Sequence, residues 1–202
     1  MIPRVLVVTP PAGDLSPVLA ALDADGPDVA VWLRRPGASA RSLLAEGGTL
    51  IRRLGGPARL VVGGRLDVAH ALGAGVHLPE RGLRPSAARR VLGPAALVGA
   101  SRHDLPGLRA LSGASYATLS PFAAVPGKGR PLGAAGFAEI RQAVAELPVL
   151  ALGGIDAAVG ADARRAGADG VAVLRAIARA EDPAAVLAQL RQLQATERAP
   201  GA

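Results

Sequence analysis

The sequence has no cysteine, four aromatic residues and a single lysine, Lys128, among its 23 basic residues. The lack of cysteine excludes disulfides, thiolate metal sites and a cysteine nucleophile. Four aromatic side chains are too few to form stacking platforms for single-stranded nucleic acid. The core must therefore consist mainly of Ala, Val and Leu.

Long apolar runs are also absent. No run reaches the ~18 residues that cross a membrane, and residues 1–10 lack the apolar region and cleavage site of a signal peptide. The net charge is +7, but the arginines are spread along the chain and never more than two are adjacent. We therefore expect a cytoplasmic protein with no membrane or nucleic-acid partner, and the arginines leave room for a small anionic substrate.

Eight short apolar runs alternate with eight longer segments of helical pattern. Most of the short runs show no polar alternation, which is typical of strands buried on both faces of a parallel sheet. We expect strands over residues 4–10, 29–34, 58–63, 75–78, 96–101, 116–121, 149–153 and 170–174. We expect helices over residues 15–24, 38–54, 66–72, 85–92, 105–111, 135–147, 157–166 and 183–195.

Eight such units in 202 residues favour an α/β fold, a compact (β/α)8 TIM barrel. The alternative is an open doubly wound sheet, but it would leave two runs unplaced, and residues 9–13 do not match the G-x-G-x-x-G that follows its first strand. The sequence predicts one domain over residues 1–195 and a frayed tail over 196–202. Asp182-Pro183 predicts a helix start, and Gly55-Gly56 and Gly93-Pro94 predict helix ends.

Active sites of such barrels lie at the carboxyl ends of the strands, and phosphate binds after strands seven and eight. The seventh expected strand ends in Gly153-Gly154, and the eighth ends at Val173, Leu174 and Arg175. Glycines there let backbone N–H groups face an anion. The sequence therefore predicts a phosphate site, with a simple turn as the alternative.

A long segment, residues 120–133, follows the sixth expected strand and holds Lys128 and Arg130. Loops of this length in compact domains are often functional. We expect these two cations to clamp an anionic group as the loop closes. A solvated surface loop is the alternative.

Two histidines, His77 and His103, lie at strand ends and are candidate general bases, with a structural role as the alternative for each. Arg34 and Arg65 follow the second and third expected strands and are candidate anion ligands. The histidines and carboxylates show no metal-ligand spacing, so we predict no metal site.

Six segments, taken in order, resemble the thiamine-phosphate synthases and their TenI-type relatives: residues 65–69, 73–78, 98–101, 116–121, 148–155 and 166–173. The resemblance covers roughly residues 29–190. It implies a TIM barrel that binds a thiazole phosphate. A synthase would join this to a pyrimidine pyrophosphate with magnesium, whereas a TenI-type protein would isomerise a thiazole carboxylate phosphate.

The resemblance also implies roles for individual residues. The phosphate cradle of the family corresponds to Gly153, Gly154, Val173 and Leu174. The arginine, serine and pyrophosphate-binding lysine of its site correspond to Arg34, Ser101 and Lys128.

Other positions depart from the synthase pattern. Gly63-Gly64 stand where the synthases have Asn and a magnesium-binding Asp, and Gly82 stands at the second aspartate. Pro36 replaces a lysine, and Val125 and Gly127 replace two threonines. The Gly-Arg and Leu-Pro pairs at residues 64–65 and 78–79 are more similar to TenI-type sequences, although the TenI histidine corresponds to Pro121.

Three functions remain open at this point. The first is a TenI-type, thiazole tautomerase-like enzyme with His103 or His77 as base and Ser101 in the site. The second is a synthase with an arginine-rich site, the only case in which magnesium would be a cofactor. The third is a non-catalytic or regulatory protein that binds thiazole phosphate or thiamine phosphate. A homodimer is left open.

Overall fold

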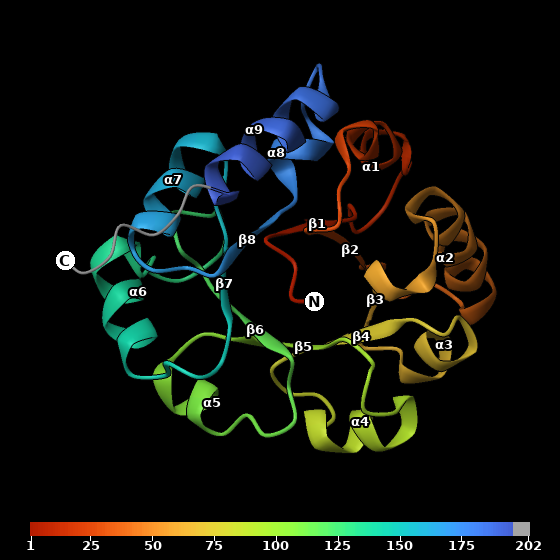
Figure 1. Ribbon diagram of the computed structural model, residues 1–202, viewed down its shortest axis with the longest axis horizontal. Helices are drawn as coiled ribbons and strands as arrows, with labels where there is room; N and C mark the ends of the chain where they lie inside the picture. The colour runs from red at the N-terminus through yellow and green to blue at the C-terminus, as the bar shows by residue number, and fades with distance from the viewer. Residues whose placement is uncertain (196–202) are drawn as a thin grey trace.

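The computed structural model describes residues 1–195. Eight parallel strands pair in sequence order, and β1 also pairs with β8, so that the sheet closes into a barrel inside a ring of helices (Figure 1). The strands are β1 (Val5–Val8), β2 (Val29–Leu33), β3 (Leu60–Gly63), β4 (Gly75–Leu78), β5 (Val98–Arg102), β6 (Tyr116–Leu119), β7 (Val149–Leu152) and β8 (Gly170–Val173). The predicted (β/α)8 barrel is thereby confirmed.

Each predicted helical segment contains a helix. The α-helices are α1 (Ser16–Ala21), α2 (Ala40–Leu54), α3 (Leu66–Ala71), α4 (Pro85–Leu92), α5 (Leu105–Arg109), α6 (Gly133–Gln142), α7 (Ala157–Arg165), α8 (Arg175–Ala178) and α9 (Pro183–Ala195), and the 3-10 helices are η1 (Leu22–Ala24) and η2 (Pro57–Arg59). Sequence analysis missed α8 and η2, because three or four residues are too few to show a helical period. The predicted tail over 196–202 lies outside the described residues.

Local sequence signals act as expected at the helix ends. The Asp182 carboxylate accepts a hydrogen bond from the Ala185 N–H at 2.9 Å, and α9 begins at Pro183. Gly55 ends α2 in the left-handed conformation, with φ of +71°. These two signals therefore set where α9 begins and where α2 ends.

The apolar side chains form two layers. The inner layer fills the barrel and consists of Leu6, Val8, Ala30, Trp32, Val61, Tyr116, Leu150 and Ala172. The outer layer packs the other face of the strands against the helices. The N-terminal segment runs into the middle of the barrel opening, where Ile2 packs against the inner layer (Figure 1). The carboxyl ends of the strands lie at the other end of the barrel.

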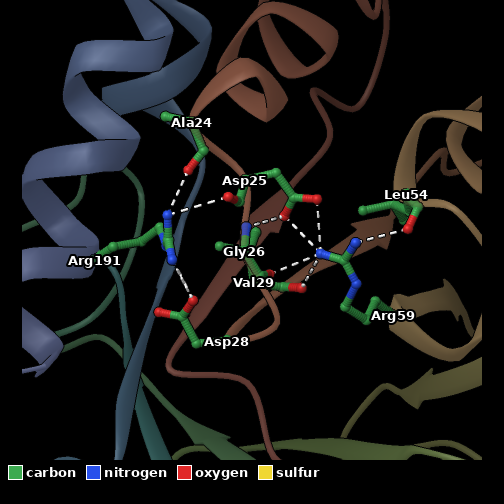
Figure 2. Close-up of polar contacts among 8 residues, drawn as sticks. All are labelled: Ala24, Asp25, Gly26, Asp28, Val29, Leu54, Arg59 and Arg191. Carbon is green, nitrogen blue, oxygen red and sulfur yellow. Dashed lines mark hydrogen bonds and ion pairs between the residues drawn. The ribbon is translucent and has the colours of Figure 1, made fainter.

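Two arginines join distant segments at the N-terminal end of the barrel (Figure 2). Arg191 in α9 bonds the Asp28 carboxylate at 2.9 Å and the Ala24 carbonyl at 2.9 Å. Arg59 bonds the Asp25 carboxylate at 2.6 Å and the Leu54 carbonyl at 2.7 Å. The segment before β2 is thus held from both sides, by the last helix and by the chain that leads into β3.

Within residues 1–195, none of the helices combines the length and the apolar character that crossing a membrane requires.

Candidate functional site

A cavity of about 750 Å³, here called the larger cavity, opens at the carboxyl ends of the strands. It gathers predicted residues from seven of the strand ends and the segments that follow them: Arg34, Arg65, His77, Ser101, His103, Lys128, Gly153 and Leu174. These residues are far apart in sequence and meet because parallel strands end on the same side of the barrel.

A second, smaller cavity of about 430 Å³ lies where β7 and β8 end, and Gly153, Gly154, Leu174 and Arg175 contribute to its wall. The glycines adopt φ of +100° and +69°. Within residues 1–195, the N–H groups of Gly154, Leu174 and Arg175 donate to no protein acceptor. Donors of this kind can bind the oxygens of a phosphate.

Two predicted ligands lie elsewhere. Val173 is buried in β8 and lines neither cavity, so any contribution it makes is to the backbone of the strand. Arg130 is exposed in the segment between β6 and α6 and also lines neither cavity.

The cations of the larger cavity differ in their partners. Arg65 forms two hydrogen bonds with Asp67, at 2.9 and 2.6 Å, and these bonds lower the pKa of Asp67 to about 2. In the described part of the chain, no carboxylate pairs with Arg34 or Lys128. Arg35, the neighbour of Arg34, is buried and holds Glu46 at 2.7 Å. Arg34 and Lys128 are therefore the cations that can meet an anionic ligand.

His77 borders the larger cavity at the end of β4 and is nevertheless fully buried. Its Nε2 lies 2.9 Å from the Ser101 Oγ and its Nδ1 lies 3.0 Å from the Tyr116 hydroxyl, while its ring stacks on Trp32 with centroids 3.8 Å apart. Burial, together with the positive charges of Arg102 and Arg34, lowers the pKa of His77 to about 3. The imidazole is neutral, and both of its nitrogens are engaged.

His103 differs from His77 because it is exposed at the rim of the cavity. The Ser120 carbonyl lies 2.6 Å from its Nδ1, and the Glu80 carboxylate lies 3.8 Å from its Nε2. A carbonyl can only accept, so Nδ1 carries the hydrogen and Nε2 keeps its lone pair. Nε2 is therefore the ring nitrogen of His103 that is available to a ligand.

The residues present do not fit a magnesium site. Glu80 is the one carboxylate in the wall of the larger cavity, and Gly64 and Gly82 offer no oxygen side chain. Across residues 1–195, His, Asp and Glu side chains form no group of three that could hold a metal ion. Magnesium prefers carboxylate oxygens, and the single carboxylate here already faces His103.

Sequence analysis missed three side chains that surround His77. Tyr116 and Thr118 lie two residues apart in β6 and face the barrel interior beside His77, and Trp32 does so from β2. The period of two along a strand places Trp32 on the same face as Arg34, but it does not show which neighbouring strand supplies a partner.

Comparison with known proteins agrees with this geometry. The family model for thiamine monophosphate synthase matches residues 5–177. A thiamine-phosphate synthase of Chloroflexus aurantiacus is 41% identical over 172 residues, which cover 81% of this chain and 78% of that protein. One of Methanoculleus marisnigri is 41% identical over 191 residues, covering 91% and 90%.

A solved structure, the thiamine phosphate pyrophosphorylase of Pyrococcus furiosus, superposes with a TM-score of 0.80 and 26% identity over 95% of both chains. The closed barrel, the cavity at its carboxyl end and these matches lead to one conclusion: the chain belongs to the thiamine monophosphate synthase family of thiamine biosynthesis.

Proposed function

We propose that this protein binds a thiazole phosphate in the two cavities and moves a proton on the thiazole ring, as a TenI-type tautomerase would. One observation carries the proposal: among residues 1–195, the only carboxylate that lines the larger cavity, Glu80, faces the only exposed imidazole there, His103. An imidazole–carboxylate pair suits proton transfer near neutral pH. It does not suit a reaction that needs carboxylates to hold a metal.

The phosphate end of the ligand fits the smaller cavity. The unpartnered N–H groups of Gly154, Leu174 and Arg175 supply donors, and the Arg175 side chain adds a positive charge. The ring would then extend into the larger cavity, where Arg34 and Lys128 have no carboxylate partner in the described part of the chain. Anchoring by the phosphate fixes the ring relative to His103.

The proposed step is an exchange of protons. The Nε2 of His103 removes a proton from one ring position, the electron pair remains on the ring, and the imidazolium returns the proton to another position. The Ser120 carbonyl holds the Nδ1–H throughout, and Glu80 stabilises the charge on the ring of His103. One histidine serves as both base and acid.

The second candidate is thiamine-phosphate synthase activity, because relatives about 40% identical carry that name. A pyrophosphate leaving group then has to be stabilised by cations. Arg34 and Lys128 line the cavity, and Arg65 is available only if it leaves Asp67.

One pair of assays separates the candidates. The protein is incubated with thiazole carboxylate phosphate in D₂O, and isomerisation and deuterium uptake are followed by NMR. We expect turnover without magnesium, reduced on the order of 10²–10⁴-fold in His103→Gln and unchanged in the control His70→Gln, whose side chain is exposed on α3.

The second assay supplies thiazole phosphate and the pyrimidine pyrophosphate, with and without magnesium. Magnesium-dependent formation of thiamine phosphate, without isomerisation, would replace the first candidate by the second. Binding of thiazole phosphate without turnover in either assay would identify a binding protein.

A further inference from the structure

A chain of hydrogen bonds runs from inside the barrel to the floor of the larger cavity. The Tyr116 hydroxyl, fully buried, lies 3.0 Å from the Nδ1 of His77, and the Nε2 of His77 lies 2.9 Å from the Ser101 Oγ. Ser101 is half-buried and lines the cavity. The Thr118 hydroxyl lies 3.3 Å from the same Oγ. Ser101 is thus the one member of the chain that a ligand can touch without displacing the others.

The backbone around this chain is adapted to it. A Cβ at Gly99 would overlap the Tyr116 hydroxyl and the Nδ1 of His77, so only glycine at this position of β5 lets the two side chains meet. Trp32 stacks on the His77 ring from the other side. The imidazole is therefore fixed in position as well as in its partners.

The direction of the hydrogen bonds follows from the tyrosine. Burial raises the pKa of Tyr116, so its hydroxyl keeps its proton, and His77 is its one hydrogen-bond partner among residues 1–195. A buried donor without an acceptor is costly, so the O–H donates to Nδ1. The neutral imidazole then carries its single hydrogen on Nε2 and donates it to the Ser101 Oγ.

We propose that His77, fixed by Tyr116, positions Ser101 as a hydrogen-bond donor to an acceptor atom on the ring end of the ligand. The Oγ of Ser101 accepts from His77, and in the geometry found also from Thr118, so its own hydrogen is directed to the cavity. In the opposite tautomer Nε2 would accept the serine proton, and Ser101 would be set up as a nucleophile. The structure favours Ser101 as a hydrogen-bond donor over Ser101 as a nucleophile.

The acceptor belongs to the ring rather than to the phosphate, an assignment that rests on the proposed function. Ser101 lies near the end of β5, beside His103, whereas the phosphate donors follow β7 and β8. A ring nitrogen and a ring carboxylate offer the same chemistry, a lone pair in the plane of the ring. Two ligands distinguish them: thiazole phosphate and thiazole carboxylate phosphate.

The tautomer is tested first, by ¹⁵N NMR of protein labelled at histidine, with the His77 signals assigned by His77→Gln. We expect the hydrogen on Nε2 and a hydrogen-bonded lone pair on Nδ1, whose shift changes in Tyr116→Phe. A hydrogen on Nδ1 would overturn the proposal. This measurement needs no ligand, so its result is independent of the proposed function.

Binding is then measured by calorimetry with the two thiazole ligands and with inorganic phosphate. We expect Ser101→Ala to weaken the binding of at least one thiazole ligand about tenfold, as loss of one hydrogen bond does. The affinity for inorganic phosphate should be unchanged. A loss confined to the carboxylate ligand identifies the carboxylate as acceptor, and a loss for both identifies the ring. The control His70→Gln, at an exposed position on α3, should change the affinity for either thiazole ligand less than twofold.

Two variants of His77 test its positioning role. Glutamine keeps an N–H near the place of Nε2, so His77→Gln should retain the affinity within about threefold, whereas His77→Leu should lose about as much as Ser101→Ala. Equal affinity for the thiazole ligands in wild type, Ser101→Ala and His77→Leu would overturn the inference. If wild type binds neither thiazole ligand, it is the proposed function that fails.

Discussion

His77 illustrates how a single residue is adapted to the interior of a barrel. A buried imidazole avoids the cost of a buried charge by remaining neutral, and it avoids unpaired polar atoms by bonding Ser101 and Tyr116. The same residue type at the rim, His103, is exposed and has one ring nitrogen free of a hydrogen. Burial thus distinguishes two histidines at neighbouring strand ends, one enclosed among fixed partners and one open to the cavity, as the two proposed roles require.

The buried state of His77 makes the fold sensitive to acid. Its pKa is about 3 in the folded chain, whereas the ordinary pKa of a histidine is 6.5, so between these pH values the unfolded chain binds a proton that the folded chain does not. This difference in proton binding lowers the free energy of unfolding as the pH falls from 6.5 toward 3, by at most about 1.4 kcal/mol per pH unit. Above pH 6.5 it has no effect.

Urea unfolding between pH 4 and pH 7 measures this slope. We expect His77→Gln, which cannot titrate, to show a shallower loss of unfolding free energy than wild type. His70→Gln serves as the control, because His70 is exposed on α3. Parallel pH curves for wild type and His77→Gln would contradict the assignment of a neutral buried histidine.

The only lysine, Lys128, is the second residue with a distinct prediction. It lines the larger cavity, whereas Arg130, two residues later, lines neither cavity. We expect Lys128→Ala to weaken thiazole phosphate binding by about 1–3 kcal/mol, as loss of a charged hydrogen bond does, and Arg130→Ala to have a smaller effect. Calorimetric titration of both variants measures this, and a larger loss in Arg130→Ala would show that the segment closes as predicted from the sequence.

At the scale of elements, the segment between β6 and α6 rests on the end of β7. The Phe122 N–H bonds the Leu152 carbonyl at 2.8 Å, and the Ala123 N–H bonds the Gly153 carbonyl at 2.9 Å. A Cβ at Gly154 would lie 2.8 Å from the Ala123 Cβ and 3.1 Å from the Ala124 carbonyl. The glycine pair is therefore required for packing as well as for access to the phosphate donors.

This packing predicts that even the small change Gly154→Ala weakens phosphate-ligand binding. Alanine at φ of +69° is strained by about 1–2 kcal/mol, and its methyl displaces the segment that carries Lys128. Gly55→Ala is the matched control, because Gly55 has φ of +71° but nothing within 4 Å of an added Cβ. Thermal unfolding should report a loss in both variants, whereas calorimetry should report weaker binding in Gly154→Ala alone. Full affinity in Gly154→Ala would refute the packing argument.

At the scale of the whole molecule, the first and last β–α units must be held together. Strand pairing between β1 and β8 does this inside, and Arg191 does it outside by bonding Asp28 and the carbonyls of Ala24 and Asp25 (Figure 2). Several charge-assisted hydrogen bonds to one guanidinium stabilise the fold more than an isolated ion pair on the surface does.

Arg191→Ala should therefore lower the free energy of unfolding by about 1–3 kcal/mol. Arg165→Ala, which removes an exposed pair with Asp162 within α7, should cost about 0.5 kcal/mol or less. Urea unfolding compares the two variants. Thiazole phosphate affinity should be unchanged in both, because the Arg191 network lies at the opposite end of the barrel from the cavities. Equal stability of the two variants would contradict the role of Arg191 in closing the ring.

The sequence alone determined the architecture, because each strand, turn and helix cap is encoded locally. The strands are encoded by continuous Val and Leu runs, and helix ends by signals such as the Asp182 cap and the Gly55 stop, each within a few residues. Eight strand–helix units in register allow one closed parallel sheet. It also located the end of the barrel at which the larger cavity opens and eight of the residues that line this cavity, since a barrel places its site at the strand ends.

Only the tertiary structure decided what those residues can do. The pairing of Glu80 with His103 and the bonds of His77 to Tyr116 and Ser101 join strands that are far apart in sequence. Burial, which makes one histidine neutral and leaves the other exposed, depends on the closed barrel around them. Contacts across strands follow from the register and packing of the whole sheet, and no local pattern carries that information.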